Sequence, residues 1–152
     1  MRKENLMLNV LIQAAGGSSE RRIYNERTLE YKGTRPGGPP YPYPYGFILG
    51  TRSEDEGCVD CYVITQDSLQ AGSIVECEAV GLLEQDENGE IDHKVLAALP
   101  GERVDLDQEL EDRLRAFIST SFAGHPEMKV TVGRILPREA ALRHIEESRW
   151  EG

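Results

Sequence analysis

Residues 72–83 read Gly-Ser-Ile-Val-Glu-Cys-Glu-Ala-Val-Gly-Leu-Leu, and this stretch decides the fold because polar and apolar side chains alternate along its first half. Alternation with a period of two is typical of a β-strand that has one polar and one apolar face. The apolar face carries Val75, Cys77 and Ala79. The stretch therefore predicts a strand, and it is longer than the short apolar strand predicted at 61–64.

A turn signal follows this strand. The pair Asn88-Gly89 favours a tight hairpin because both positions tolerate a positive φ angle. Residues 94–99 then return as the partner strand. The hairpin places Asp86 on one side of its turn and Asp92 on the other.

Shorter strand patterns lie before and after the hairpin. The sequence predicts short strands at 10–12, 61–64 and 130–132. Residues 34–44 are rich in Gly and Pro and predict an irregular loop, which is stiffened by the fixed φ angles of proline.

Two helices are predicted in the last third of the chain. Apolar residues recur at helical spacing over 107–118, with Asp105 and Asp107 available as caps. A second helix opens at Pro137 and continues through Ile145. Strands first and helices after them indicate a mainly β fold with flanking helices (α+β), built on a small closed or nearly closed barrel.

Size and charge limit the possible functions. A chain of 152 residues is expected to form one domain over 1–152. Its 27 acidic residues exceed its 17 basic ones, and a net charge of −10 repels nucleic acid and anionic membranes. A polyanionic substrate is repelled too, unless divalent cations lie between it and the protein. No apolar run is long enough for a transmembrane helix, so we expect no membrane partner.

The three cysteines, Cys58, Cys61 and Cys77, form an odd set in a chain with enough apolar residues to fold without disulfides. This usage favours a cytoplasmic location. A zinc site would need a second cysteine pair or suitably spaced histidines, and neither is present. We expect the cysteines to be buried free thiols.

Residues 53–61 contain four acids and two cysteines, and further acids flank the hairpin turn. Hard cations such as Mg²⁺ prefer carboxylate oxygens, so these positions are candidate metal ligands. The candidates are Asp55, Asp60, Asp86 and Asp92. Spacing alone leaves open the alternative that they are solvated turns of an acidic protein.

Basic residues next to these segments provide possible anion contacts. Arg21, Arg35 and Lys94 each stand beside a segment that carries an acid or tyrosine of interest. Guanidinium groups bind phosphate oxygens through two parallel hydrogen bonds. Taken singly, each of the three could equally be a surface charge.

The order of these segments resembles that of soluble family I inorganic pyrophosphatases. Residues 41–48 read Tyr-Pro-Tyr-Pro-Tyr-Gly-Phe-Ile, similar to the family's Tyr-Pro-x-x-Tyr-Gly-Phe-Ile. Residues 55–60 stand where the family has Asp-Gly-Asp-Pro-x-Asp, and residues 78–94 resemble its Val-Gly-x-Leu strand and Asp-x-x-Gly-x-x-Asp-x-Lys segment. The resemblance extends from about Val10 to Ile145.

The resemblance implies a five-stranded OB-like β-barrel with about two α-helices, Mg²⁺-dependent hydrolysis of inorganic diphosphate, and dimers or hexamers. Departures from the family pattern leave Mn²⁺ or Zn²⁺ as alternative metals and a related phosphoanhydride as an alternative substrate. The resemblance also implies residue roles. By matching position, the metal ligands are Asp55, Asp60, Asp86 and Asp92, the phosphate contacts are Arg21, Arg35 and Lys94, and Tyr45 lies near the attacking water.

The chain also departs from the family pattern. Gly57 stands at the middle aspartate of the motif, and the resemblance implies that this aspartate is the proton acceptor. Glu56 is the adjacent carboxylate, and it could replace that aspartate only if the loop were locally twisted, because neighbouring side chains in an extended segment point to opposite faces. Ser121-Phe122 matches a Tyr-Lys pair that binds phosphate, while Gln13 and Ile23 lie where glutamates are usual.

Two functional hypotheses follow from this combination. The first is a diphosphatase with reduced or altered activity, because a general base typically contributes about 10² to 10⁴-fold to the rate. The second is a catalytically silent relative that binds phosphate, nucleotide or a protein partner. A nucleic-acid-binding barrel is a third possibility that the acidic composition opposes.

Overall fold

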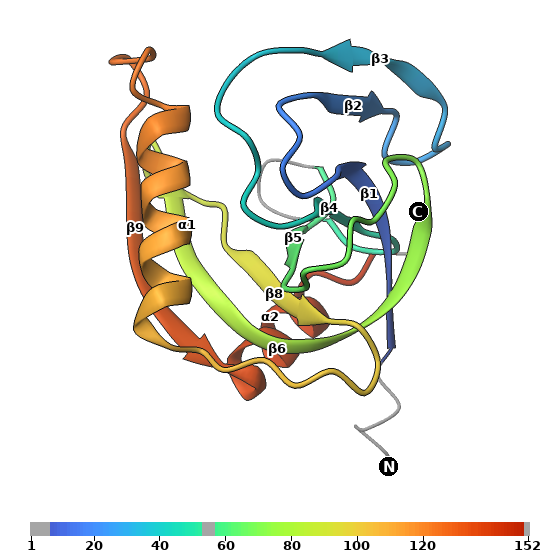
Figure 1. Cartoon of the computed structure of the whole chain (residues 1–152). Helices are drawn as coiled ribbons and strands as arrows, with labels where there is room; N and C mark the ends of the chain where they lie inside the picture. Colours follow the sequence, from blue (N-terminus) through green and yellow to red (C-terminus); the bar gives the residue numbers. More distant parts are fainter. Residues whose placement is uncertain (1–6, 53–56, 151–152) are drawn as a thin grey trace.

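The computed structural model describes residues 7–52 and 57–150. Its elements in chain order are β1 (Met7–Ala14), β2 (Arg21–Tyr24), β3 (Tyr31–Arg35), β4 (Tyr45–Ile48), β5 (Asp60–Val63), β6 (Ile74–Glu87), β7 (Glu90–Ile91), β8 (Lys94–Ala98), α1 (Gln108–Ser121), β9 (Val130–Pro137) and α2 (Arg138–Glu147) (Figure 1).

The strand β6 closes the barrel because it has different partners along its length. Its first part pairs with β1, its middle part with β8 and its last part with β9, all antiparallel. Irregularities in register between Ala79 and Gly81 and between Leu83 and Gln85 accompany these changes of partner, as expected for β-bulges, which bend a strand. The order β1-β4-β5-β8-β6, with β6 returning to β1, is the predicted five-stranded barrel with two flanking helices.

The apolar core has two layers on opposite faces of the sheet. Along β5, Cys61 and Val63 belong to the layer that contacts α2, whereas Tyr62 belongs to the layer that contacts α1. The alternation of side chains along a strand produces this separation. The α1 layer contains the aromatic rings of Tyr45 and Tyr62, and this layer leads to the candidate site.

Several predicted elements are confirmed in detail. The alternating strand exists and continues to Glu87, and the turn at Asn88 and Gly89 has positive φ angles at both residues. The first helix begins after Asp107, whose Oδ1 accepts a hydrogen bond from the Leu110 amide at 3.0 Å. Pro137 is the last residue of β9 and the N-cap of α2.

The sequence patterns missed the antiparallel pair β2 and β3 and the strand β4. The β2–β3 pair is largely exposed and charged, so it lacks the alternation that marks a half-buried strand. The four residues of β4 are all buried, and a short run of this kind has no periodicity to detect. Among the described residues, neither helix has the length and apolar character that crossing a bilayer demands.

We predict that Gly46→Ala destabilises the fold by about 3 kcal/mol, because overpacked backbone contacts cost roughly this much. A Cβ at this position of β4 would overlap the main-chain carbonyl of Leu11 on β1, which cannot move without breaking the pairing. Denaturant unfolding measures the change. Gly124→Ala is the matched control because a Cβ there meets no atom within 4 Å; equal midpoints for the two variants would contradict the prediction.

Candidate active site

The centre of the site is the ammonium group of Lys94, which is buried at the start of β8. Its Nζ donates to Asp60 Oδ2 at 2.6 Å, to Asp92 Oδ2 at 2.9 Å and to the Tyr45 hydroxyl at 3.3 Å. The side chain of Lys94 is only 6% exposed. One cation thus holds together two of the predicted metal ligands and the predicted tyrosine.

Strand pairing explains why these residues meet. β5 and β8 run parallel, with Cys61 opposite Val95, so Asp60 and Lys94 begin the two strands at the same end. β4 pairs with β5 so that Tyr45 lies opposite Tyr62, two residues after Asp60 and therefore on the same face. The site is built from the ends of three adjacent strands.

The charges of the cluster stabilise the charged form of the lysine. Burial alone would lower the pKa of Lys94, but Asp60, Tyr45 and Asp92 outweigh it and hold the pKa well above its ordinary value. Burial, followed by the nearby Asp60 carboxylate, raises the pKa of Tyr45 well above its usual range. Lys94 therefore stays charged and Tyr45 stays neutral at physiological pH.

Glu87, which the sequence did not suggest as a site residue, joins the cluster. Burial and a hydrogen bond with Glu87 raise the pKa of Asp92 to about 8, although Lys94 opposes the shift. The Gln85 side-chain amide donates to Glu87 at 3.2 Å, and Asp92 is fixed by its own amide, which donates to the Gln85 carbonyl at 2.9 Å. The only sequence signal for Glu87 was its place beside Asp86 at the hairpin turn.

The remaining predicted acids are less closely involved. Asp86 lies in β6 near the turn, and its Oδ1 accepts a hydrogen bond from the Gly89 amide at 3.2 Å rather than joining the Lys94 cluster. Asp55 and Glu56 lie outside the described residues. Gly57 is described and provides no carboxylate.

The predicted arginines lie next to each other on the β2–β3 pair, where Arg21 is opposite Arg35. The guanidinium of Arg21 lies 5.3 Å from the centre of the Tyr45 ring, so it faces the Lys94 cluster. Burial lowers the pKa of Arg21, but Tyr45, Tyr41 and Asp60 outweigh it and raise the pKa. Its buried Nε has no hydrogen-bond partner among the described residues, while Arg35 is exposed.

The positions that depart from the family pattern are occupied by packed side chains. Gln13 is buried and its Nε2 donates to the Arg22 carbonyl at 3.1 Å, which ties β1 to β2. Ile23 belongs to β2. Ser121 ends α1 and its hydroxyl donates to the Phe117 carbonyl at 2.8 Å, and Phe122 packs against the aromatic layer.

Asp60 and Asp92 fit a hard divalent cation in chemistry, because such cations prefer carboxylate oxygens and these two already surround a positive charge. The described residues alone do not assemble three such side chains in a metal-binding arrangement. Asp60 and Asp92 are the pair that the structure brings together. Asp86 lies near the β6–β7 turn, where it pairs with Ile91, the residue before Asp92.

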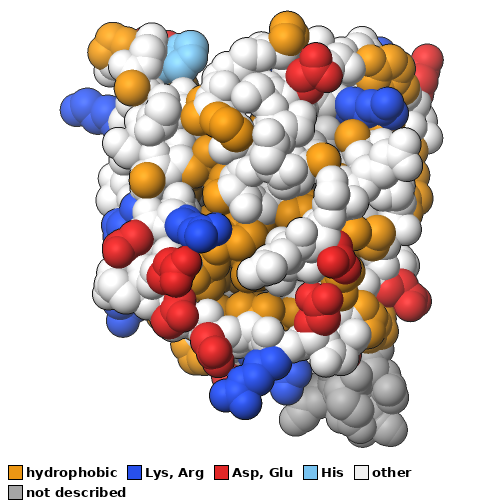
Figure 2. Space-filling model, viewed as in Figure 1, with side chains coloured by type: hydrophobic (Ala, Val, Ile, Leu, Met, Phe, Trp, Pro, Cys, Tyr) orange, Lys and Arg blue, Asp and Glu red, His pale blue; other side chains and the backbone are white. Residues whose placement is uncertain are grey.

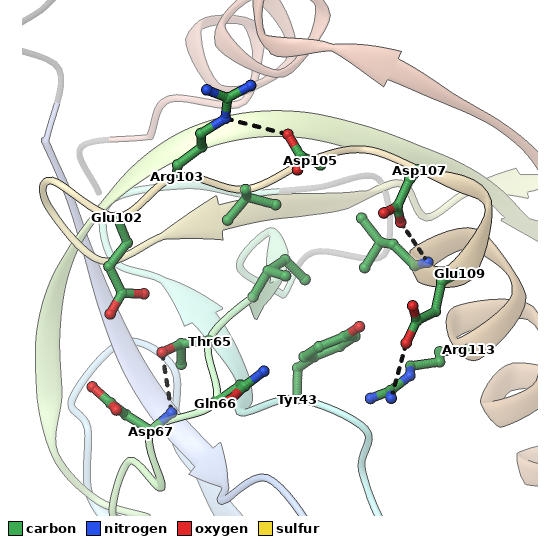
Figure 3. A pocket seen from close by; sticks show the side chains of 13 residues that line it. Tyr43, Thr65, Gln66, Asp67, Glu102, Arg103, Asp105, Asp107, Glu109 and Arg113 are labelled. Atoms are coloured by element: carbon green, nitrogen blue, oxygen red, sulfur yellow. Dashed lines mark hydrogen bonds and ion pairs between the residues drawn. The ribbon is translucent and has the colours of Figure 1, made fainter.

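A separate cavity of about 600 Å³ lies at the opposite ends of β5 and β8 and contains none of the predicted site residues (Figure 3). Figure 2 shows hydrophobic side chains at the floor of a hollow and charged side chains around it. The charged groups largely satisfy one another, because Arg113 pairs with Glu109 and Arg103 with Asp105. The described lining of this cavity therefore carries no free charged cluster of its own, and the Lys94 cluster is the candidate active site.

The barrel with an acidic and basic cluster at its strand ends defines a site for a cation and an anion together, as in phosphate hydrolases. A model of the inorganic pyrophosphatase family matches residues 22–151. The chain belongs to the inorganic pyrophosphatase family.

Individual relatives agree with this assignment. The inorganic pyrophosphatase of Nanoarchaeum equitans is 28% identical over 148 residues, which cover 90% of this chain and 92% of that protein. The solved inorganic pyrophosphatase of Thermus thermophilus has a TM-score of 0.84 and 26% identity, covering 97% of this chain and 92% of that one. The one from Coxiella burnetii has a TM-score of 0.82 with 24% identity, covering 93% and 92%.

We predict that Asp92→Asn changes the pH dependence of stability in the absence of metal. The folded pKa of Asp92, about 8, exceeds the unfolded value near 4, so the folded state binds its proton more tightly and the wild type loses stability as pH rises through this interval. The variant lacks this loss. The difference in free energy of unfolding between variant and wild type should therefore shift by about 1–2 kcal/mol in favour of the variant between pH 5 and pH 9. Urea unfolding with a chelator present measures the difference, and parallel pH profiles would contradict the assignment.

Proposed function

We propose that the protein hydrolyses inorganic diphosphate to two phosphates with the help of divalent metal ions. The observation that carries this proposal is the buried Lys94 ammonium held between Asp60 and Asp92 in a chain of the inorganic pyrophosphatase family. Arg21 and Lys94 provide buried positive charge for the phosphates, and the unpartnered Nε of Arg21 is a donor that an anion can satisfy.

The metal ions would be held by Asp60 and Asp92, with Asp86 and Asp55 as further ligands. When bound, such ions lower the pKa of water and neutralise phosphate charge. The protein's own groups then bind and orient the substrate. Lys94 and Arg21 stabilise the charge that develops on the departing phosphate, and Tyr45, which is neutral, fixes the position of Lys94 through its hydroxyl.

The chain is proposed to be a slower or altered catalyst because it lacks a carboxylate at Gly57. No described carboxylate takes over that place, and Glu56 stays a prediction. Mg²⁺ is the proposed metal, with Mn²⁺ or Zn²⁺ as alternatives. Inorganic diphosphate is the proposed substrate. Assembly into a dimer or hexamer and a cytoplasmic location are two further predictions.

The first test is phosphate release from diphosphate with Mg²⁺, Mn²⁺ or Zn²⁺. We expect activity that a chelator abolishes, and a loss of at least about 10²-fold in kcat for Asp60→Asn, because a charged group acting in the transition state is removed. Asp67→Asn is the matched control, since Asp67 lies in the loop after β5 and lines the separate cavity. A wild type without phosphate release under every metal would favour the silent relative.

A second test restores the missing carboxylate. Gly57→Asp should raise kcat by about 10²-fold, the lower range of general-base catalysis. Gly57→Asn controls for the added side chain because it has nearly the same size and accepts no proton at neutral pH. Equal turnover in the two variants would show that the missing base does not limit the rate.

A further inference from the structure

The tip of the β2–β3 hairpin is a rigid turn. Asn25 Oδ1 accepts hydrogen bonds from the amides of Arg27 and Thr28 at 2.9 and 3.0 Å. The Asn25 amide donates to the Glu30 carbonyl at 2.8 Å, which closes the turn. These hydrogen bonds hold the backbone from which the side chains of the tip extend.

Glu26, within this turn, is hydrogen-bonded to the segment that leads into β5. Its Oε1 accepts a hydrogen bond from the Cys58 amide at 2.6 Å, a contact between residues 32 positions apart. The Cys58 thiol also donates to the Glu26 carbonyl at 3.7 Å. Hydrogen bonds to an ionised acceptor are short and stronger than neutral ones.

This hydrogen bond depends on the residue at position 58. In the family motif quoted above the matching residue is proline, which has no N–H to donate. Cys58 supplies that donor in this chain, and Glu26 accepts it. The link is therefore a feature of this sequence rather than of the motif.

Three more contacts hold the same region. The guanidinium of Arg27 lies 3.7 Å from the centre of the Trp150 ring, and the Trp150 amide donates to the Gly50 carbonyl at 3.1 Å. Thr51 Oγ1 accepts a hydrogen bond from the Val59 amide at 2.9 Å. The amides of residues 58 and 59 are thus bound from two sides, immediately before Asp60.

The hairpin carries Arg21 and Arg35 at the end away from its tip, whereas Asp60 follows the segment that Glu26 binds. We propose that Glu26 is a positioning residue that fixes the phosphate-binding arginines relative to the metal-binding aspartate. This inference rests on the proposed function. Its consequence is that loss of the Glu26 carboxylate weakens substrate binding more than it slows turnover.

The test compares three variants. Glu26→Ala removes the acceptor, Glu26→Gln keeps an acceptor oxygen, and Glu30→Ala removes an exposed carboxylate from the same turn whose side chain takes part in none of these contacts. We expect Glu26→Ala to raise KM for diphosphate about tenfold with less than a threefold change in kcat. Glu26→Gln should return KM to within about threefold of the wild type, and Glu30→Ala should leave it unchanged.

Two readouts do not require activity. Amide hydrogen exchange should show faster exchange at Cys58 in Glu26→Ala than in the wild type, and calorimetry should show weaker binding of inorganic phosphate in the presence of Mg²⁺. Unchanged KM and unchanged phosphate affinity in Glu26→Ala would overturn the inference. It would also be overturned if Glu26→Gln restored neither the KM nor the phosphate affinity of the wild type. A wild type that binds phosphate without hydrolysing diphosphate would overturn the proposed function alone, while one that does neither would overturn both.

Discussion

The buried ammonium of Lys94 is the interaction on which the site depends. Removing a lysine charge from water costs several kcal/mol, and only well-placed partners recover that cost. Asp60, Asp92 and Tyr45 provide three such partners within hydrogen-bond distance. Asp60 and Tyr45 belong to different strands and Asp92 precedes β8. The ammonium group can therefore stay charged only when these segments are in register, so the fold and the site are stabilised together.

The topology makes this arrangement possible. Most pairs of the barrel are antiparallel, but β5 and β8 are parallel. Parallel neighbours begin at the same end of the sheet. Asp60 and Lys94, the first residues of β5 and β8, therefore lie side by side. The antiparallel strand β4 then adds Tyr45 from the other side of β5.

Local patterns in the sequence predicted local structure well. The alternation in β6, the Asn88-Gly89 turn and the Asp107 cap each depend on a few consecutive residues, and each is confirmed. Glu87 and Glu26 could not be recognised in the same way. Glu87 reaches Asp92 because the β6–β7 turn folds back, and Glu26 meets Cys58 across 32 residues, so neither contact leaves a periodic signal.

The charge balance of the site bears on the proposed binding of metal and substrate. Lys94 and Arg21 contribute two positive charges, whereas the Asp60 carboxylate pairs with Lys94 and Asp92, whose pKa is about 8, adds negative charge above that pH. A diphosphate anion that approaches this cluster in a chain of net charge −10 gains little from the protein alone. Divalent cations bound at Asp60 and Asp92, as proposed, would reverse the sign of the local field and would lower the pKa of Asp92 by favouring its ionised form. Metal and diphosphate should therefore each strengthen the binding of the other, as thermodynamic linkage requires when one ligand supplies the charge that the other needs.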